Sequence, residues 1–476
     1  MDSQSVRSLA LYSSAGLVVA YCVNKLLNSK TNLPYPPGPR PLPILGNSRQ
    51  IPASSPWFTY HEWAQQYGPI VHLKAIGEHI LVINSAKVAD DLLEKRSNIY
   101  SDRPDIPMIQ LMGWDFNIGF MKYGDKWRKY RRLMHHLAAA IMMASVYGYD
   151  IQPVNDSFVS LVRAAVERLG ESVFPGAVAV NKFPWLRHFP GWLPGFGFQK
   201  FCADTRVINT RMKEVPYEFA KHNMLEGTDT TSVVARILIS GKHDDNVELI
   251  QGVAGLAFAA GADTTVSAIS TFFMAMALYP EVQAKAQREL TAVVGAHRLP
   301  EISDRQRLPY VDAVYREVLR WRPVLPLSVS HATSKDDVYD GYFIPKGTQV
   351  VANIWSMCHD ESIYAEPDKF KPERFLDDDG GLVNDPRMNI LAYGHGRRIC
   401  VGRHMADETV WAVIASVLHV YEIGKVKDLS GNDIDIVVRF SGGIVSHPEP
   451  FPCSITPRSE NEKQLVEGTI AAVYDI

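Results

Sequence analysis

Cysteine and net charge are both scarce in this sequence. Its five cysteines form no CxxC pair, and their odd number argues against a disulfide framework and for a reducing compartment. The 49 basic and 52 acidic residues leave a net charge of −3, too small for a field that attracts nucleic acid. No GxGxxG motif follows an expected strand, so the chain carries no nicotinamide- or flavin-binding fingerprint of its own.

Internal repeats and low-complexity tracts are absent as well. Of the 476 residues, 46% are hydrophobic and 21% are charged. This ordinary globular balance excludes a disordered, collagen-like or polytopic membrane chain. At about 150 residues per domain the length suggests roughly three domains, although single enzyme domains of this size are common.

The N-terminus combines an uncharged stretch with a proline-rich one. Ser8–Asn24 is 17 residues long and lies between Arg7 and Lys25, at the short end of what spans a bilayer, where about 20 apolar residues is usual. No small-residue cleavage site follows, and the basic residues lie mainly after the stretch. Both features favour an uncleaved membrane anchor over 1–27 with a cytosolic body, against a disordered, mildly apolar N-terminus. Prolines then predict a stiff, extended hinge over 28–47.

Helical periodicity dominates the body from about Glu167 onward. The clearest predicted helices are Glu281–Val294, Tyr310–Trp321 and Ala406–Val420. Short β-branched runs predict strands at Ile70–Ile83, Gln349–Ile354 and Ile434–Phe440. The expected fold is mainly α with a small β region.

One predicted helix, Ile250–Tyr279, is unusually long and apolar. Its 30 residues end at Pro280 and carry one charge, Asp263. A helix of this length extends about 45 Å, the width of a whole domain. A transmembrane helix is the alternative, but an aspartate at its centre costs roughly 2.5–3.5 kcal/mol on insertion scales. We therefore expect a buried central helix.

Within that helix, Asp263 and Thr264 place a carboxylate beside a hydroxyl. Gly261 precedes them at a cost of about 1 kcal/mol relative to alanine, which suggests room left for a flat ligand or a small molecule. A threonine hydroxyl can bond the carbonyl one turn back and open the helix locally. The pair is a candidate proton relay, and a buried aspartate satisfied by a neighbouring segment is the alternative.

A second constellation pairs Glu317 with Arg320 on a predicted helix. Residues at i and i+3 share a face, so the two can form a salt bridge, although most exposed pairs contribute only about 0–1 kcal/mol. Arg374, in the segment Pro372–Phe375, could close a buried triad.

The third constellation is Tyr393–Gly402, in which Gly394, Gly396 and Arg398 precede Cys400. A cysteine just before a helix gains thiolate character from the helix dipole and free amides. Glycines let the backbone approach a bulky planar group, and arginines neutralise acidic arms of a ligand. Haem ligation by a cysteine thiolate fits this combination best.

Two other chemistries remain for Cys400. Zinc could use His395 or His404 as further ligands, but a structural site needs four ligands and no partner pair is visible. A nucleophilic cysteine would need an orienting histidine, which the same residues could supply. Neither explains the glycines and the arginines together.

Taken in order, these motifs resemble the cytochrome P-450 family, the haem-thiolate monooxygenases, of the microsomal type common in fungi. The resemblance runs from the proline-rich hinge to about Ser459, which implies a catalytic domain over 48–459 and a C-terminal tail over 460–476. Its motifs are Trp127–Arg131 as WxxxR, Ala260–Thr265 as the relay, Glu317–Arg320 as ExxR, Pro372–Phe375 as PERF, and the Cys400 loop. The fold that it implies holds haem b between the long central helix and the helix after the cysteine loop.

The resemblance also implies roles by position. Cys400 matches the axial ligand of the haem iron. The residues that match the cofactor-binding positions are Trp127, Arg131, His331, Gly394, Gly396, Arg398 and Cys400. His331 stands where many members carry an arginine to a haem propionate. Asp263 and Thr264 match the acid and the alcohol that pass protons to dioxygen. The residues that match the structural salt-bridge triad are Glu317, Arg320 and Arg374.

Three positions depart from the family's pattern. Tyr393 replaces the usual phenylalanine of the cysteine loop, and Val401 stands where proline is frequent. A core helical segment of the family is missing between Leu137 and Tyr147. Its loss would remove several buried apolar side chains, each worth about 1.5–3 kcal/mol, from a domain with roughly 5–15 kcal/mol to spare. A haem-binding but catalytically impaired member is therefore the alternative.

The activity that the resemblance implies is insertion of one atom of dioxygen into a lipophilic substrate, as in secondary metabolism. Electrons would come from an NADPH-dependent flavin reductase that docks near Arg128, Lys129 and Arg132, and the enzyme would be anchored in the endoplasmic reticulum membrane. A haem-thiolate isomerase or dehydratase is less favoured because it needs no proton relay to dioxygen.

Three stretches fall where the family lines its substrate pocket. They are the apolar run Met108–Phe120, Val324–Val329 and Ser441–Val445. Ligand pockets are predominantly apolar, so these stretches suggest an apolar substrate, although an aromatic-rich run is also typical of packed core.

Overall fold

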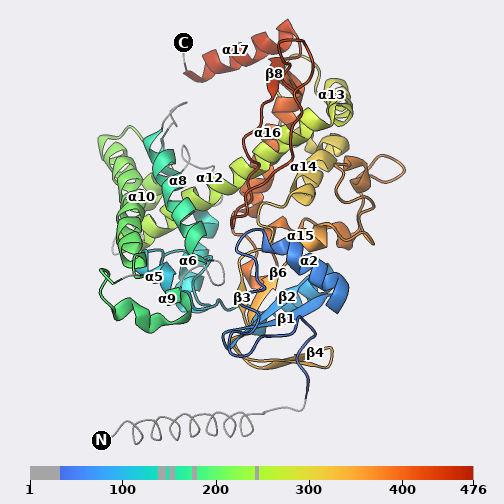
Figure 1. The fold of residues 1–476 in the computed structure, drawn as a ribbon. Coiled ribbons are helices and arrows are strands. Elements are labelled where there is room, and N and C mark those ends of the chain that lie inside the picture. Colours follow the sequence, from blue (N-terminus) through green and yellow to red (C-terminus); the bar gives the residue numbers. More distant parts are fainter. Residues whose placement is uncertain are drawn as a thin grey trace, which may run out of the picture.

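The computed structural model of the chain describes residues 33–137, 146–149, 156–173, 179–193, 195–241 and 246–474. Helix α12 (Val247–Leu278) crosses the molecule from one group of helices to another, and the main sheet lies to one side of this helical body (Figure 1). The predicted anchor over 1–27 lies outside the described residues, as do Ala138–Ala144 of the predicted deletion.

The predicted helices are confirmed with small changes at their ends. Glu281–Val294 belongs to α13 (Pro280–Val294), Tyr310–Trp321 to α14 (Pro309–Trp321) and Ala406–Val420 to α16 (Arg403–Val420). The other long helices are α2 (Pro56–Tyr67), α6 (Asp125–Leu137), α8 (Ser157–Val173), α10 (Phe198–Glu226) and α17 (Glu460–Tyr474). The short helices are α3 (Ala86–Ala89), the π-helix η1 (Asp90–Lys95), α4 (Ser97–Tyr100), α5 (Pro107–Leu111), α9 (Ala179–Lys182), α11 (Val233–Ile239) and α15 (Ile354–Cys358).

Helix α12 is the predicted central helix. It ends at Leu278 because Pro280 lacks the N–H that would continue it and instead begins α13. Among the described residues it is the one helix long and apolar enough to cross a membrane, yet 56% of its most apolar window is buried within the protein. This burial supports the expected core helix.

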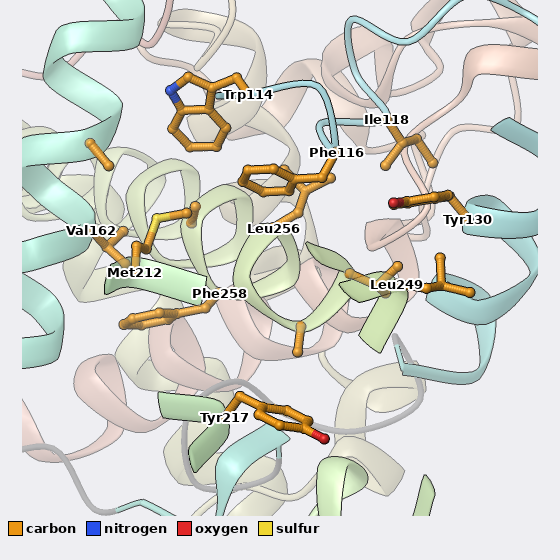
Figure 2. Packing of buried hydrophobic residues seen from close by; sticks show 14 of the residues in the cluster. Trp114, Phe116, Ile118, Tyr130, Val162, Met212, Tyr217, Leu249, Leu256 and Phe258 are labelled. Atoms are coloured by element: carbon orange, nitrogen blue, oxygen red, sulfur yellow. The ribbon is translucent and has the colours of Figure 1, made fainter. Parts of the chain in front are cut away.

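Two hydrophobic clusters divide α12 between them. Its first half packs with α6, α8 and α10, and Figure 2 shows Trp114 and Phe116 facing Leu256 within that cluster. Its second half packs with α13, α14 and α16. The segment 260–265, which carries the predicted relay, therefore lies at the junction of two separately packed regions.

The main sheet has the strand order β1-β2-β6-β3, with β1 (Ile70–Ala75) and β2 (Glu78–Ile83) as an antiparallel hairpin. The predicted run Ile70–Ile83 is thus two strands. β6 (Gln349–Ala352) pairs parallel to β2, and β3 (His331–Ala332) pairs antiparallel to β6. The smaller sheets pair β4 (Asp337–Tyr339) with β5 (Tyr342–Ile344) and β7 (Tyr421–Gly424) with β8 (Ser454–Pro457).

The predicted strand Ile434–Phe440 is wrong. The structure has only isolated bridges there, Lys427 with Asp433 and Phe440 with Pro448. Val437 is 62% exposed, and no neighbouring strand lies alongside the run to bury its β-branched side chains. Such residues form a strand only where a partner and a covered face are available.

The described part of the proline-rich segment lies against the main sheet. The His72 N–H donates to the Pro37 carbonyl at 2.8 Å, and the Tyr35 ring stacks on His72. Gly46, at φ 60°, passes so close to the sheet that an added Cβ would stand 1.7 Å from the Lys74 carbonyl oxygen. Residues 33–41 therefore lie against β1 without regular secondary structure, and the chain then turns at 43–45, so the predicted extended form does not continue to residue 47.

Candidate functional site

The cysteine loop enters α16 directly. The Cys400 N–H donates to the Tyr393 carbonyl at 2.9 Å, which closes the loop on itself. The Cys400 side chain is exposed to solvent, yet crowding by protein atoms raises the pKa of its thiol. The Gly402 N–H and the guanidinium groups of Arg131 and Arg403 act in the opposite direction and favour a thiolate.

Two glycines of this loop have different reasons for being glycine. Gly396 has φ 61°, and a Cβ there would lie 2.1 Å from the Leu93 carbonyl oxygen of η1. Its N–H also donates to the Glu94 carboxylate at 2.6 Å. Gly394 has φ 73° with open space where a side chain would stand. Gly396 thus serves contact with the protein itself, and Gly394 a left-handed turn beside an open space.

Three arginines, Arg103, Arg131 and Arg398, gather on one side of this loop; we call them the cation cluster. Arg398 donates to the backbone carbonyls of Ser101, Ile118 and Met121. Within the described part of the chain none of the three forms a salt bridge. Desolvation lowers the pKa of all three, that of Arg398 to about 10, and at Arg103 and Arg398 it outweighs the opposing charge of Asp102.

The ring of Trp127, in α6, lies against two members of the cation cluster. The guanidinium carbon of Arg398 is 4.5 Å from the ring centroid, and that of Arg131 is 5.3 Å away. The Trp127 Nε1 atom is buried and donates to no atom of the described residues. Unneutralised guanidinium groups and an unused N–H fit a ligand with carboxylate arms, as haem has.

His331 lies beside this cluster, fully enclosed by protein. Its Nδ1 is 2.7 Å from the Tyr100 carbonyl oxygen, so this nitrogen donates. Desolvation, aided by the charge of Arg103, lowers the pKa of His331 far below its usual range. The neutral ring then presents Nε2 as an acceptor, and a bond from Nε2 to a carboxylate arm would require a second proton.

Glu317, Arg320 and Arg374 come together in one buried group, which we call the salt-bridge triad. Arg320 donates to both Glu317 oxygens at 2.6 and 2.9 Å, and Arg374 Nε donates to one of them at 3.2 Å. The Lys371 N–H adds a fourth bond at 2.8 Å. Desolvation works against the Arg320 charge, but the pairing with Glu317 outweighs it and raises the Arg320 pKa.

Of the Asp263–Thr264 pair, Thr264 contacts its own helix and Asp263 contacts the C-terminal loop. The Thr264 hydroxyl donates to the Ala260 carbonyl one turn back at 2.7 Å, as predicted. The Asp263 carboxylate lies 3.2 Å from Nε2 of His447, in the C-terminal loop that follows Ser441–Val445. The carboxylate is therefore held by a distant segment.

The three stretches expected to line a pocket meet at one small cavity. Phe120, Leu327, Val329 and Ile444 all line it, and its volume is about 50 Å³. Ser328 lines it too, with a left-handed φ of 53°. Most of the run Met108–Phe120 is packed in the hydrophobic cluster of Figure 2, so the cavity would have to widen to admit a ligand of ordinary size.

Tyr393, a departure from the family's pattern, has a partner for its hydroxyl. Its oxygen lies 2.9 Å from that of Tyr315 on α14, the helix that carries Glu317 and Arg320. Arg305 lies over the Tyr315 ring and pairs with Asp407 of α16. The cysteine loop is thereby connected to the helix of the salt-bridge triad.

Sequence reasoning did not single out Arg103, Tyr315 or His447. Arg103 and His447 lie in irregular segments with no motif around them, so only the fold brings them to the site. A signal existed for Tyr315, because the buried hydroxyl of Tyr393 requires a partner. The side chain of Arg132, predicted to dock a reductase, lies outside the described residues.

Comparison with known proteins agrees with this arrangement. The cytochrome P450 family model matches residues 36–172 and 136–453. Cytochrome P450 monooxygenase 208 of Postia placenta is 41% identical over 91% of this chain and 92% of its own length. Cytochrome P450 monooxygenase claR of Ampulloclitocybe clavipes is 37% identical over 95% and 91%, respectively. Cytochrome P450 monooxygenase ARMGADRAFT_974139 of Armillaria gallica is 36% identical over 98% and 99%.

The two matched stretches overlap at 136–172, a range that includes the region where the sequence predicts a missing segment. The comparisons give no support to a catalytically impaired member. Identity of this extent shows the family's mainly α fold and its haem b cofactor. The chain therefore belongs to the cytochrome P450 family and is a haem-thiolate monooxygenase, an oxidoreductase that incorporates oxygen from dioxygen.

Proposed function

We propose that this monooxygenase oxidises a lipophilic organic substrate at a haem held by Cys400, with electrons from an NADPH-dependent flavin reductase. The observation that supports this most strongly is the cation cluster beside the cysteine loop. Arg103 and Arg398 are buried and Arg131 is half-buried; none of the three forms a salt bridge among the described residues, and burial lowers their pKa. A chain keeps such charges buried where a ligand neutralises them.

In this proposal the Cys400 thiolate would bind the haem iron, and Trp127, Arg131 and Arg398 would hold the carboxylate arms, with His331 nearby. Gly394 and Gly396 shape the loop so that Cys400 precedes the α16 N-terminus, where free amides stabilise its negative charge. Bound there, haem supplies the electron-transfer and dioxygen chemistry that side chains lack.

The proton relay that we propose uses Asp263 and Thr264. The Thr264 hydroxyl can give its proton forward and take another, since it is both donor and acceptor. Asp263, the next residue on α12, is the acid that returns a proton to it. The hydrogen bond from Thr264 to Ala260 holds the hydroxyl at one position before transfer.

The proposed substrate site is the cavity that Phe120, Leu327, Val329 and Ile444 line. These side chains are apolar and favour a lipophilic substrate. Ser328 adds a hydroxyl that is buried without a partner among the described residues.

The proposed setting is the endoplasmic reticulum membrane, with an anchor over 1–27, a hinge over 28–47, the catalytic domain over 48–459 and a tail over 460–476. Arg128 and Lys129 are exposed on α6, the helix that carries Trp127, so a reductase docked near Arg128, Lys129 and Arg132 would lie close to the haem. Arg128 pairs with Asp125, and Lys129 donates to Asn246 at 2.9 Å, so both contacts would open on docking.

The test is the carbon monoxide difference spectrum of the reduced chain, purified with haem. We expect the Soret band of a thiolate ligand, the band from which the family takes its name, and its loss in Cys400→Ser. A wild-type chain without that band, or a Cys400→Ser variant that keeps it, would refute the assignment of Cys400. Reconstitution with a fungal flavin reductase and NADPH then tests the electron source.

A further inference from the structure

The contact between Asp263 and His447 joins the central helix to the C-terminal loop. His447 Nε2 lies 3.2 Å from Asp263 Oδ1, and the two side chains are 32% and 24% exposed. Among the described residues Asp263 has no other ion-pair partner. Its carboxylate orientation therefore depends on His447.

The loop around His447 is fixed to the same face of α12. The Ser267 hydroxyl, one turn after Asp263, donates to the Ser446 carbonyl at 2.6 Å, and this bond is buried. The neighbouring loop residues Ser446 and His447 thus contact Ser267 and Asp263, which are four residues apart on α12 and lie on one face of the helix. The pairing is built by two contacts and is not an isolated surface ion pair.

The loop also fixes its own shape around the histidine. The His447 N–H donates to the Ser441 hydroxyl at 3.0 Å, and the Ser441 N–H donates to the His447 carbonyl at 2.8 Å. These reciprocal bonds limit where the imidazole can stand. A histidine held in this way limits the rotamers open to Asp263, since the carboxylate must meet Nε2.

We propose that His447 is a positioning residue for the proton relay, holding the Asp263 carboxylate in the orientation from which it serves Thr264. This rests on the proposed roles of Asp263 and Thr264. A carboxylate without this contact would rotate among its staggered positions, so fewer turnovers would find the acid beside the hydroxyl. Protons would arrive late, and more of the reduced dioxygen would leave as hydrogen peroxide.

The test uses the full chain with haem, reconstituted with a fungal flavin reductase and NADPH, and measures hydrogen peroxide released per NADPH consumed without added substrate. His447→Leu removes the polar contact, and His447→Gln keeps an N–H donor of similar reach. We expect the leucine variant to raise the peroxide ratio at least about twofold and the glutamine variant to return it close to wild type. In an Asp263→Asn background, His447→Leu should add no further change.

Thermal unfolding of the wild type, His447→Leu, Asp263→Asn and the double variant gives a second readout that needs no turnover. If the two residues are coupled, the change in unfolding midpoint for the double variant should be smaller than the sum of the single changes. A wild-type peroxide ratio in His447→Leu, failed rescue by glutamine, or an undiminished effect on Asp263→Asn would overturn the proposal. Absence of the thiolate band in the wild-type chain would instead contradict the proposed function, and the unfolding measurement would still test the contact.

Discussion

The salt-bridge triad and the cation cluster both withdraw arginine side chains from solvent, and they differ in what neutralises the charge. In the triad, Glu317 accepts from both arginines, and this pairing keeps the Arg320 pKa raised despite burial. In the cation cluster no carboxylate does so among the described residues, and burial lowers the arginine pKa values. The carboxylate that pairs with the triad's arginines comes from the chain itself, whereas we propose that a bound ligand completes the cation cluster.

Removing the carboxylate of the triad should have the largest effect on stability. Glu317→Gln leaves Arg320 and Arg374 buried beside a neutral amide, which we expect to lower the free energy of unfolding by about 3–5 kcal/mol. Urea unfolding measures this. Glu373→Gln is the matched control, because Glu373 belongs to the same PERF segment but forms a half-exposed pair with Lys285, and it should cost no more than about 1 kcal/mol. Equal losses in the two variants would contradict the distinction.

His359 tests how far the charge of the triad reaches. Its ring stacks on Trp355, Nδ1 donates to the Trp355 carbonyl at 2.8 Å, and burial, helped by Arg320 and Arg322, lowers its pKa to about 3. Asp368 lies 3.9 Å away but is 80% exposed, too solvated to offset this.

The unfolded-state pKa of a histidine is near 6.5. Below that pH the unfolded chain therefore binds a proton at His359, whereas the folded chain leaves the ring neutral. The stability that this group contributes is complete above about pH 6.5 and falls by about 1.4 kcal/mol per pH unit on acidification toward its folded pKa. His359→Gln should make the acid limb of a stability–pH curve shallower by about one proton. Urea unfolding at pH 7, 6 and 5 checks this, with exposed His404→Gln as the control. An unchanged slope on the acid side of the curve would show that His359 is protonated in the folded chain as readily as in the unfolded chain.

In the cation cluster the expected effect is on ligand retention. Arg131→Met removes a guanidinium that, among the described residues, makes one hydrogen bond, to the Ile399 carbonyl at 3.0 Å. We expect the haem-free chain to change its unfolding free energy by less than about 1 kcal/mol, and haem to leave about tenfold faster, equivalent to about 1.4 kcal/mol. Haem transfer to excess apomyoglobin measures the rate, and Lys129→Met on the same helix is the control. Destabilisation of the haem-free chain as severe as that of Glu317→Gln would place Arg131 with the triad instead.

Sequence patterns predicted the parts of the molecule that depend on local periodicity. The apolar run around Asp263 was long enough to require a helix, and the spacing of Glu317 and Arg320 placed both on one face. The strand predicted at Ile434–Phe440 failed because a strand needs a neighbour, and β-branched residues alone do not reveal whether one is present.

Contacts between distant segments were beyond the reach of sequence patterns. The Arg103 side chain joins the cation cluster, and its guanidinium donates to the Val329 and Ser330 carbonyls, through pairings that only the folded chain creates. The partnership of His447 with Asp263 is of the same kind. Motifs therefore identify residues whose functional partners are close in sequence. They do not identify residues whose partners are brought near only by tertiary packing.

The bond between Tyr393 and Tyr315 connects the two regions, and its loss should have the smallest effect. Tyr393→Phe restores the family's usual residue and removes one hydroxyl, while the Tyr315 hydroxyl remains beside the Asp407 carboxylate. Because Tyr315 keeps an acceptor, we expect a cost of only about 0.5–1.5 kcal/mol in the free energy of unfolding. Tyr315→Phe should cost more, since it removes the bonds to both partners. The double variant should then cost less than the sum of the single ones, by the energy of the bond they share. Additive costs in urea unfolding would mean that the cysteine loop and the triad helix are stabilised independently.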